Sequence, residues 1–275
     1  MKFRLLPVLA LPVVLSACPK DKQDDSLTFA EAQQAVQEAS LASQAENFTS
    51  ASVEISTNFT IGDAVEKAAS DLRDFVGSQL PCADITLQNA TLTITYGAKA
   101  GNCTYKGQTF SGSHSIEVAK NDQAQVEVHH TWTDLSNGKV TLNGNADVTW
   151  DFSAKTRSVV HTAQWTRVSD GYTVTGSGNR QQSLLEGGLT EGIQVDGTRT
   201  WETPKGNWDL VIQGVQMRWV DPVPQAGSYA LQTPFDKTLS LSFERVDEDT
   251  IAVTVANGSK KFTFKVTKLG SVSSS

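Results

Sequence analysis

The chain has 275 residues and a formal net charge of −7, from 30 acidic residues against 23 lysines and arginines. This acidic balance, without a clustered basic stripe, argues against a protein that binds nucleic acid. Beyond residue 18, no segment is apolar enough to predict a membrane-spanning helix, which needs about 20 apolar residues.

The first 18 residues show the zones of an export signal. A short basic start, residues 1–4, precedes an apolar run at residues 5–15. The run is too short to cross a bilayer as a helix, and this order of zones is typical of a secretory signal. We therefore expect residues 1–17 to be a signal peptide.

The sequence Leu15-Ser16-Ala17-Cys18 resembles the lipobox of bacterial lipoproteins. The resemblance implies that the signal is cut before Cys18 and that Cys18 carries acyl chains such as palmitate, which bind the membrane. Residues 18–27 would then be the lipidated cysteine and its tether. Pro19 stands where an aspartate retains enteric lipoproteins in the inner membrane. The resemblance therefore favours the outer membrane, facing the periplasm or cell surface; the alternative is an ordinary signal with a chance cysteine.

Residues 28–80 predict a helical segment that packs on a sheet or caps its open end. Thr28-Phe29-Ala30-Glu31 fits a capping box, and the helix that it starts should run to about Glu46. Apolar residues recur at helical spacing from Ile61 to Val76, and Gly77 is the expected stop.

Cys82 and Cys103 remain once Cys18 is assigned to lipid. In an oxidising envelope compartment an even pair favours a disulfide. Such a bond would stabilise the fold by roughly 3 kcal/mol through the loop that it closes. The alternative is two free buried thiols.

From Asp84 onward the apolar residues alternate with period two, and turn signals such as Ser136-Asn137-Gly138 and Ser169-Asp170-Gly171 separate the runs. Glycines also interrupt several strand patterns, which favours a strongly bent sheet. We predict a mainly β (α+β) fold over residues 81–270. It would be a large curled antiparallel β meander or partial barrel preceded by two N-terminal helices, and residues 271–275 would form a frayed tail.

Large aromatic residues provide one candidate ligand face. They occupy the apolar parity at or near strand ends: Trp132, Trp150, Trp165 and Trp201. They would either pack the core and rim or line a cleft for a carbohydrate or lipid. Arg199 shares the face of Trp201 and would either meet an anionic headgroup or pair with a nearby carboxylate.

Histidines provide a second candidate site. His114, His130 and His161 fall on the apolar parity of neighbouring strands, and a simple hairpin after Lys120 would place His114 opposite His130. Three imidazoles on one face can bind Zn²⁺ together with a carboxylate or water. A one-residue slip would move a histidine to the other face, and no closely spaced ligand pair is present. We therefore expect neither a metal nor another cofactor.

The sequence contains no Gly-x-Ser-x-Gly elbow, P-loop, His-Glu-x-x-His or dinucleotide glycine motif, so we expect no enzyme. The first hypothesis is a lipid-anchored envelope lipoprotein with a non-catalytic binding or structural role and a lipid or protein partner. The alternative is a periplasmic carrier of lipid or lipoprotein acyl chains in a concave half-barrel. This architecture resembles that of the lipoprotein-sorting chaperones, without a shared motif. Whether the curled sheet is hollow or filled separates the two.

The mature region also resembles predicted lipoproteins of unassigned function from Gram-negative soil bacteria. The resemblance lies in the stretches Phe59-Thr60-Ile61-Gly62-Asp63-Ala64-Val65, Gln108-Thr109-Phe110-Ser111-Gly112 and Asp221-Pro222-Val223-Pro224-Gln225-Ala226-Gly227. It spans most of the chain and implies no particular activity.

Overall fold

The structure is a computed structural model that describes residues 26–57, 65–105, 107–121, 125–151, 153–186, 192–218, 221–268 and 270–274. Side chains are further left out at 56, 57, 65–67, 218, 221–223 and 225. The predicted signal peptide and Cys18 lie outside the described residues, as does the expected start of the second helix at Ile61.

Helix α1 spans Phe29–Thr57, and α2 spans Val65–Gln79. The capping box is confirmed, because Thr28 Oγ1 accepts from the Glu31 N–H at 3.2 Å and Glu31 Oε2 accepts from the Thr28 N–H at 2.8 Å. The expected end of α1 at Glu46 is wrong. The helix continues because its second half is enclosed by the sheet, and burial of side chains such as Phe48 overrides weak local propensity. Neither helix is long and apolar enough to cross a membrane.

Fourteen strands form one antiparallel sheet with free edges at β1 and β16. In spatial order they are β1 (Asp84–Gln88), β2 (Thr91–Tyr96), β5 (Ser111–Lys120), β6 (Val126–Ser136), β7 (Val140–Asp151), β8 (Thr156–Arg167), β9 (Thr173–Leu184), β10 (Ile193–Thr203), β11 (Gly206–Arg218), β12 (Asp221–Gln232), β13 (Thr238–Arg245), β14 (Thr250–Asn257), β15 (Lys260–Thr267) and β16 (Val272–Ser274). A small hairpin, β3 (Thr104–Tyr105) and β4 (Gln108–Thr109), is inserted between β2 and β5. The predicted curled meander is therefore confirmed, and it is open. The expected frayed tail contains β16.

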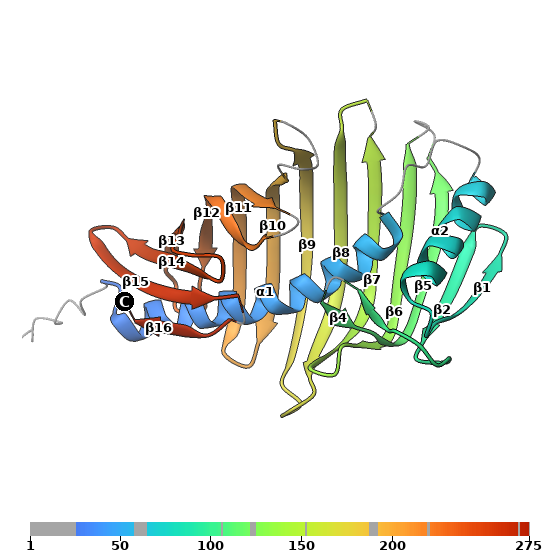
Figure 1. The fold of residues 1–275 in the computed structure, drawn as a ribbon. Helices are drawn as coiled ribbons and strands as arrows, with labels where there is room; N and C mark the ends of the chain where they lie inside the picture. Colours follow the sequence, from blue (N-terminus) through green and yellow to red (C-terminus); the bar gives the residue numbers. More distant parts are fainter. Residues whose placement is uncertain are drawn as a thin grey trace, which may run out of the picture.

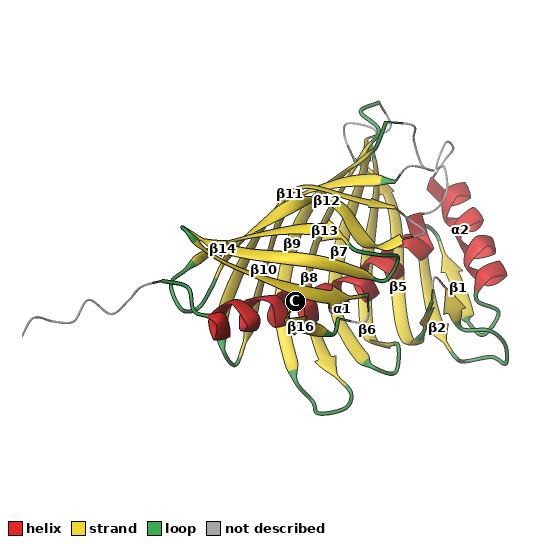
Figure 2. Ribbon diagram, turned by 60° about the vertical axis from the view of Figure 1, so that its left-hand side comes forward, coloured by secondary structure: helices red, strands yellow, loops and turns green. Residues whose placement is uncertain are grey.

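Helix α1 crosses the concave face of this sheet, while α2 lies over the first strands (Figure 1). At the other end, β13–β16 curl around the first half of α1 (Figure 2). Two contacts join the ends of the chain there: Ser40 Oγ donates to the Gly270 carbonyl at 3.1 Å, and Lys237 Nζ lies 2.7 Å from Glu31 Oε1. The first helix thus becomes the centre around which the last strands close.

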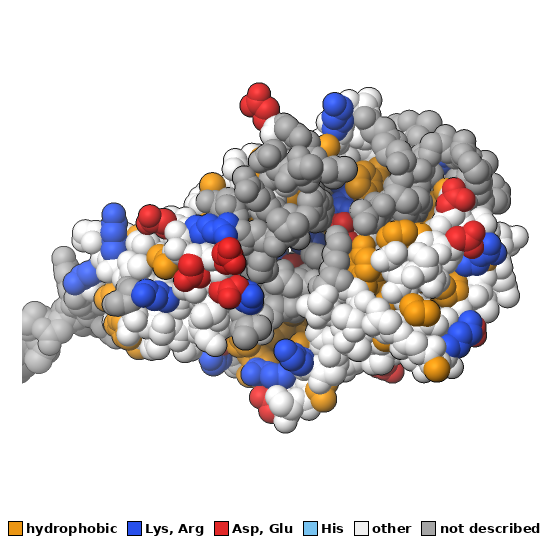
Figure 3. All heavy atoms as spheres, viewed as in Figure 1, with side chains coloured by type: hydrophobic (Ala, Val, Ile, Leu, Met, Phe, Trp, Pro, Cys, Tyr) orange, Lys and Arg blue, Asp and Glu red, His pale blue; other side chains and the backbone are white. Residues whose placement is uncertain are grey.

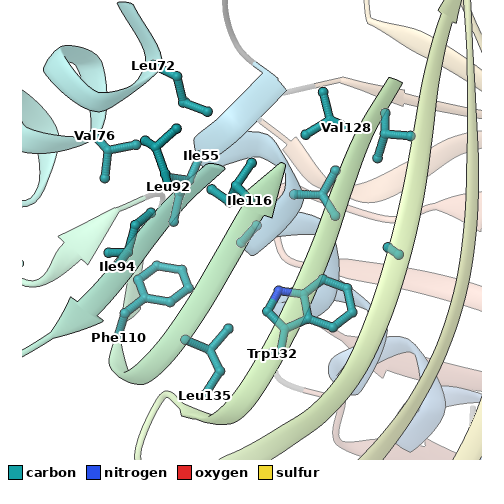
Figure 4. Packing of buried hydrophobic residues seen from close by; sticks show 14 of the residues in the cluster. Ile55, Leu72, Val76, Leu92, Ile94, Phe110, Ile116, Val128, Trp132 and Leu135 are labelled. Carbon is teal, nitrogen blue, oxygen red and sulfur yellow. The ribbon is translucent and has the colours of Figure 1, made fainter. Parts of the chain in front are cut away.

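Two apolar clusters fill the concave side. The N-terminal core joins α2, the second half of α1 and strands β2–β8. Its largest fully buried side chains include Phe48 and, labelled in Figure 4, Ile55, Leu72, Leu92, Ile94, Phe110, Ile116 and Trp132. The C-terminal core joins the first half of α1 to strands β10–β15, with Leu27, Val36, Trp208, Leu210, Leu231, Leu239 and Phe264 among its members. Side chains and α1 therefore fill the concavity on both sides of the sheet's middle.

The predicted disulfide between Cys82 and Cys103 is present, with the two Cα atoms 5.3 Å apart. It ties the turn that follows α2 to the segment that leads into the β3–β4 hairpin. Tyr105 of this hairpin meets the edge of Phe75 of α2, with ring centroids 6.4 Å apart. The bond therefore holds two cover elements together over the first strands.

Candidate functional site

Charged residues separate the two apolar cores. Glu46 and Glu54 lie two helical turns apart on α1, and both are buried. They face β8, β9 and β10, whose inward residues include three buried arginines at positions 157, 180 and 199. We call the following group the polar seam: Glu46, Glu54, Arg157, His161, Arg180, Gln182 and Arg199.

Ion pairs link α1 to the sheet across the polar seam. Glu54 pairs with Arg157, whose Nε donates to Gln182 Oε1 at 2.7 Å. Glu46 pairs with Arg180, with Oε1 and Nη2 2.6 Å apart. A buried charge is tolerated only when it is paired, so these contacts bind α1 to β8 and β9.

Glu46 is the central anion of the seam. Burial by itself raises the pKa of Glu46, but Arg180, His161 and Arg199 outweigh burial and lower this pKa to about 2. His161 Nε2 lies 3.2 Å from Glu46 Oε2. Both Glu46 oxygens are at ion-pair distance from a partner, Oε1 from Arg180 and Oε2 from His161, so mainly Coulomb attraction holds this carboxylate.

A glycine makes room for His161. Gly178 faces His161 on the neighbouring strand, and a Cβ at Gly178 would lie 2.3 Å from His161 Cε1. This strand glycine has an ordinary backbone conformation and is needed for the close approach of the imidazole. The sequence suggested bending of the sheet as the reason for such glycines; here the reason is a side chain of the seam.

Arg199 is buried and differs from the other two arginines. Its Nη1 donates to the Ala42 carbonyl of α1 at 3.3 Å, and its guanidinium lies 5.2 Å from the centre of the Trp201 ring. Of the two roles expected for Arg199, pairing with a carboxylate is not seen within ion-pair distance in the described part of the chain. Burial lowers the pKa of Arg199, which Glu46 partly opposes.

The histidines do not gather into one site. His114 Nε2 and His130 Nδ1 are 2.9 Å apart, and Tyr96 Oη lies 3.2 Å from His114 Nδ1. Burial lowers the pKa of His114 to about 3 and that of His130 well below its usual range, so both imidazoles are neutral. His161 instead faces Glu46. In the described part of the chain, no group of three His, Cys, Asp or Glu side chains is arranged to hold a metal ion.

The tryptophans mostly pack the cores. Trp132 and Trp201 are buried, and Trp150 lies beside the N-terminal core with the Arg157 guanidinium 5.0 Å from its ring centre. Trp165 lines a groove, and its Nε1–H donates to Thr49 Oγ1 of α1 at 3.0 Å. The tryptophans predicted to share one face therefore lie in three places: in or beside the N-terminal core, in the C-terminal core, and at the wall of a groove.

A groove of about 420 Å³ lies between the middle of α1 and two turns at one rim of the sheet. We call it the rim groove. Its apolar lining comprises Leu41, Ala45, Val140, Trp165, Val168 and Val174. Lys139 and Arg167 add two basic side chains, and Arg167 is held by Asp170 at 3.3 Å and by the ring of Tyr172. An apolar cavity with few polar groups is the usual form of a small-molecule site, commonly about 300–1,000 Å³ in volume.

Sequence reasoning missed the seam and the groove. Arg157 and Arg180 stand on the inward parity of their strands, as Arg199 does, and this parity was a usable signal. The groove has no sequence signal, because turns from two hairpins meet α1 only in the folded chain. Comparison with family models, curated proteins and solved structures finds no match for this chain. Its function must therefore be inferred from its own residues.

Proposed function

We propose that this protein is an envelope lipoprotein, anchored through Cys18, that binds a single-chain amphiphile in the rim groove without catalysis. The ligand would have an acyl-like apolar body and an anionic group. The groove carries this proposal, because its walls are apolar while Lys139 supplies positive charge at its border; the second basic side chain there, Arg167, is paired with Asp170. The anchored location is supported by the Leu15-Ser16-Ala17-Cys18 motif.

The tether and α1 set how far the groove would lie from the anchor. Seven residues between Cys18 and Ser26 reach at most about 25 Å when extended. From Phe29, α1 rises roughly 20 Å to the groove residues Leu41 and Ala45. The groove could thus take an amphiphile that leaves the same membrane surface.

The carrier hypothesis stays as a second candidate. The concavity itself is filled by α1 and the two cores, so a carried chain would lie in the rim groove. Val168 at the border of this groove is 55% exposed, which leaves a path for exchange. A carrier would move a fluorescent fatty acid between two vesicle populations, whereas a binding protein would only lower its free concentration.

Binding is tested with dodecanoate and with dodecanol, which share a chain length and differ in charge. We expect saturable binding of dodecanoate at one site per chain and weaker binding of dodecanol. Leu41→Trp should fill the groove and abolish binding. Gln37→Trp adds the same side chain one turn earlier on α1, outside the lining residues, and should leave binding unchanged. Equal binding by both tryptophan variants would exclude the groove.

The charge requirement is tested by Lys139→Ala. We expect about two- to fivefold weaker dodecanoate binding, the usual effect of one exposed charge pair, and no change for dodecanol. Lys260→Ala, at an exposed position on β15, is the matched control. A similar loss in both variants would show that net charge alone matters.

The anchor is tested separately. Cys18→Ala should release the protein from the membrane fraction and abolish incorporation of labelled palmitate. Membrane association that survives this substitution would rule out the lipobox assignment while leaving the groove untouched.

A further inference from the structure

We propose that the polar seam binds one small oxyanion, a carboxylate or a phosphate, against Arg199. This site is distinct from the rim groove, so its failure would leave the proposed function standing.

The first support is an imbalance of charge. The seam contains three guanidinium groups and two carboxylates, and all five side chains are buried. Glu54 pairs with Arg157 and Glu46 pairs with Arg180. Arg199 is 5% exposed, and a backbone carbonyl at 3.3 Å is the only hydrogen-bond acceptor that it has among the described residues. A buried charge that lacks a counter-charge is unfavourable, so one further anion would balance the seam.

The second support is an excess of donors. Arg199 Nε, Arg180 Nε and Trp201 Nε1 are buried and have no acceptor. Buried donors are nearly always satisfied in native proteins, and unsatisfied ones point to a missing partner. Two of these donors belong to neighbouring side chains, because the guanidinium of Arg199 lies 5.2 Å from the centre of the Trp201 ring. An oxyanion is an acceptor with several lone pairs and can serve more than one of them.

The surroundings of Arg199 disfavour cations as the ligand. Arg180 adds positive charge nearby, and Glu46, the nearest anion, is already paired with Arg180. Tyr229, which also faces Arg199, is neutral because burial raises its pKa. In the view of the concave face in Figure 3, exposed Lys, Arg, Asp and Glu side chains gather over the end that holds β13–β15, whereas the five charged side chains of the seam are buried. An anion bound against Arg199 would therefore be shielded from solvent.

The experiment measures binding of inorganic phosphate and of acetate to the whole protein by calorimetric titration, at constant ionic strength set with sodium chloride. We expect one site per chain for at least one of the two anions. The anion that binds more tightly identifies whether phosphate or carboxylate chemistry is recognised. No binding of either anion to the unaltered protein would overturn the proposal.

Arg199→Met retains an unbranched apolar chain and removes the charged guanidinium. We expect anion affinity at least about thirtyfold weaker, as for truncation of one partner of a buried charged hydrogen bond. Lys205→Met removes a lysine that pairs with Glu38 outside the seam and should leave affinity unchanged. Retained affinity in the Arg199→Met variant would also overturn the proposal.

Two readouts separate a binding role from a structural one. Without added anion, Arg199→Met should melt no lower than the unaltered protein, because the substitution removes an uncompensated charge. Glu46→Gln should bind the anion more tightly, since it removes a competing carboxylate beside Arg199 and Arg180. A structural Arg199 would give a lower melting temperature in the first variant and no gain of affinity in the second.

Discussion

The two halves of the meander cover their concave faces in different ways. In the N-terminal half, separate elements do so: α2 and the β3–β4 hairpin, joined by the Cys82–Cys103 disulfide. In the C-terminal half the strands themselves curl around α1, and no disulfide is found there among the described residues (Figure 2). One sheet can thus close its core either by adding covers or by bending around a helix that it already contains.

The buried polar groups of the N-terminal half also differ from those of the polar seam. The N-terminal half holds neutral groups that hydrogen-bond one another, Tyr96, His114 and His130. The seam between the halves holds full charges on α1 and on three strands. Apolar contact is non-directional, and the alanine-rich α1 could slide along its axis without losing much of it. We infer that the ion pairs fix the position of α1 along its own axis relative to the sheet.

The largest expected effect is at the seam. Among the described residues, Glu46→Ala leaves the buried Arg180 with Ser50 Oγ at 3.4 Å as its remaining partner, so the free energy of unfolding should fall by about 3–5 kcal/mol. Urea denaturation measures it. Lys268→Ala, which removes an exposed ion pair with Asp249, is the control and should change little. Comparable losses in the two variants would contradict a special role for the seam.

The disulfide should affect one half only. The double substitution Cys82→Ser/Cys103→Ser should lower the free energy of unfolding by about 3 kcal/mol. Hydrogen exchange should then show faster opening of α2 and β1–β2, with β10–β15 unchanged. Uniform acceleration across the sheet would mean that the two halves unfold as one unit.

Acid should weaken the N-terminal half first. The unfolded chain takes up protons at His114 and His130 below pH 6.5, whereas the folded chain resists them because burial lowers the pKa of His114 to about 3 and that of His130 well below normal. The contribution of these two histidines to the free energy of unfolding is therefore fully present above pH 6.5 and decreases as the pH falls towards 3. The loss at about pH 5.5 should be on the order of 1 kcal/mol for each histidine.

The same experiment separates the seam from the histidines. The pKa of Glu46 is lowered to about 2, so its contribution is retained above pH 4.5 and disappears only between pH 4.5 and 2. His114→Gln/His130→Gln should flatten the first phase and leave the second. If the double variant keeps the pH dependence between 6.5 and 4.5, other groups cause it.

The last comparison concerns two glycines, and Gly77→Ala has the smallest effect that we expect. Gly178→Ala would force a Cβ against the His161 ring and should destabilise the protein by about 1–3 kcal/mol. Gly77→Ala places a Cβ 3.9 Å from Ile85 within α2, where alanine favours the helix, and should stabilise by up to about 1 kcal/mol. Thermal unfolding of both variants checks the opposite signs.

Local pattern predicted most of the fold and little of the site. Alternation identified the strands and their inward faces, but the register between β5 and β6 was off by two: His114 pairs with Trp132, and His130 pairs with Ile116. A shift of two keeps each side chain on its face, which is why His114 and His130 still meet. The seam depends on where α1 crosses the sheet, and no local pattern contains that information.

The wrapping of β13–β16 around α1 has a consequence for the time course of folding. Ser40 bonds to Gly270 across 230 positions of the sequence, and Glu31 meets Lys237 across 206. Contacts of such separation slow folding, because a long loop must close before they form. The C-terminal core cannot be completed until the last strands have emerged. A chain built in this way stays incompletely folded while it is being made, which is compatible with the export that we propose for it.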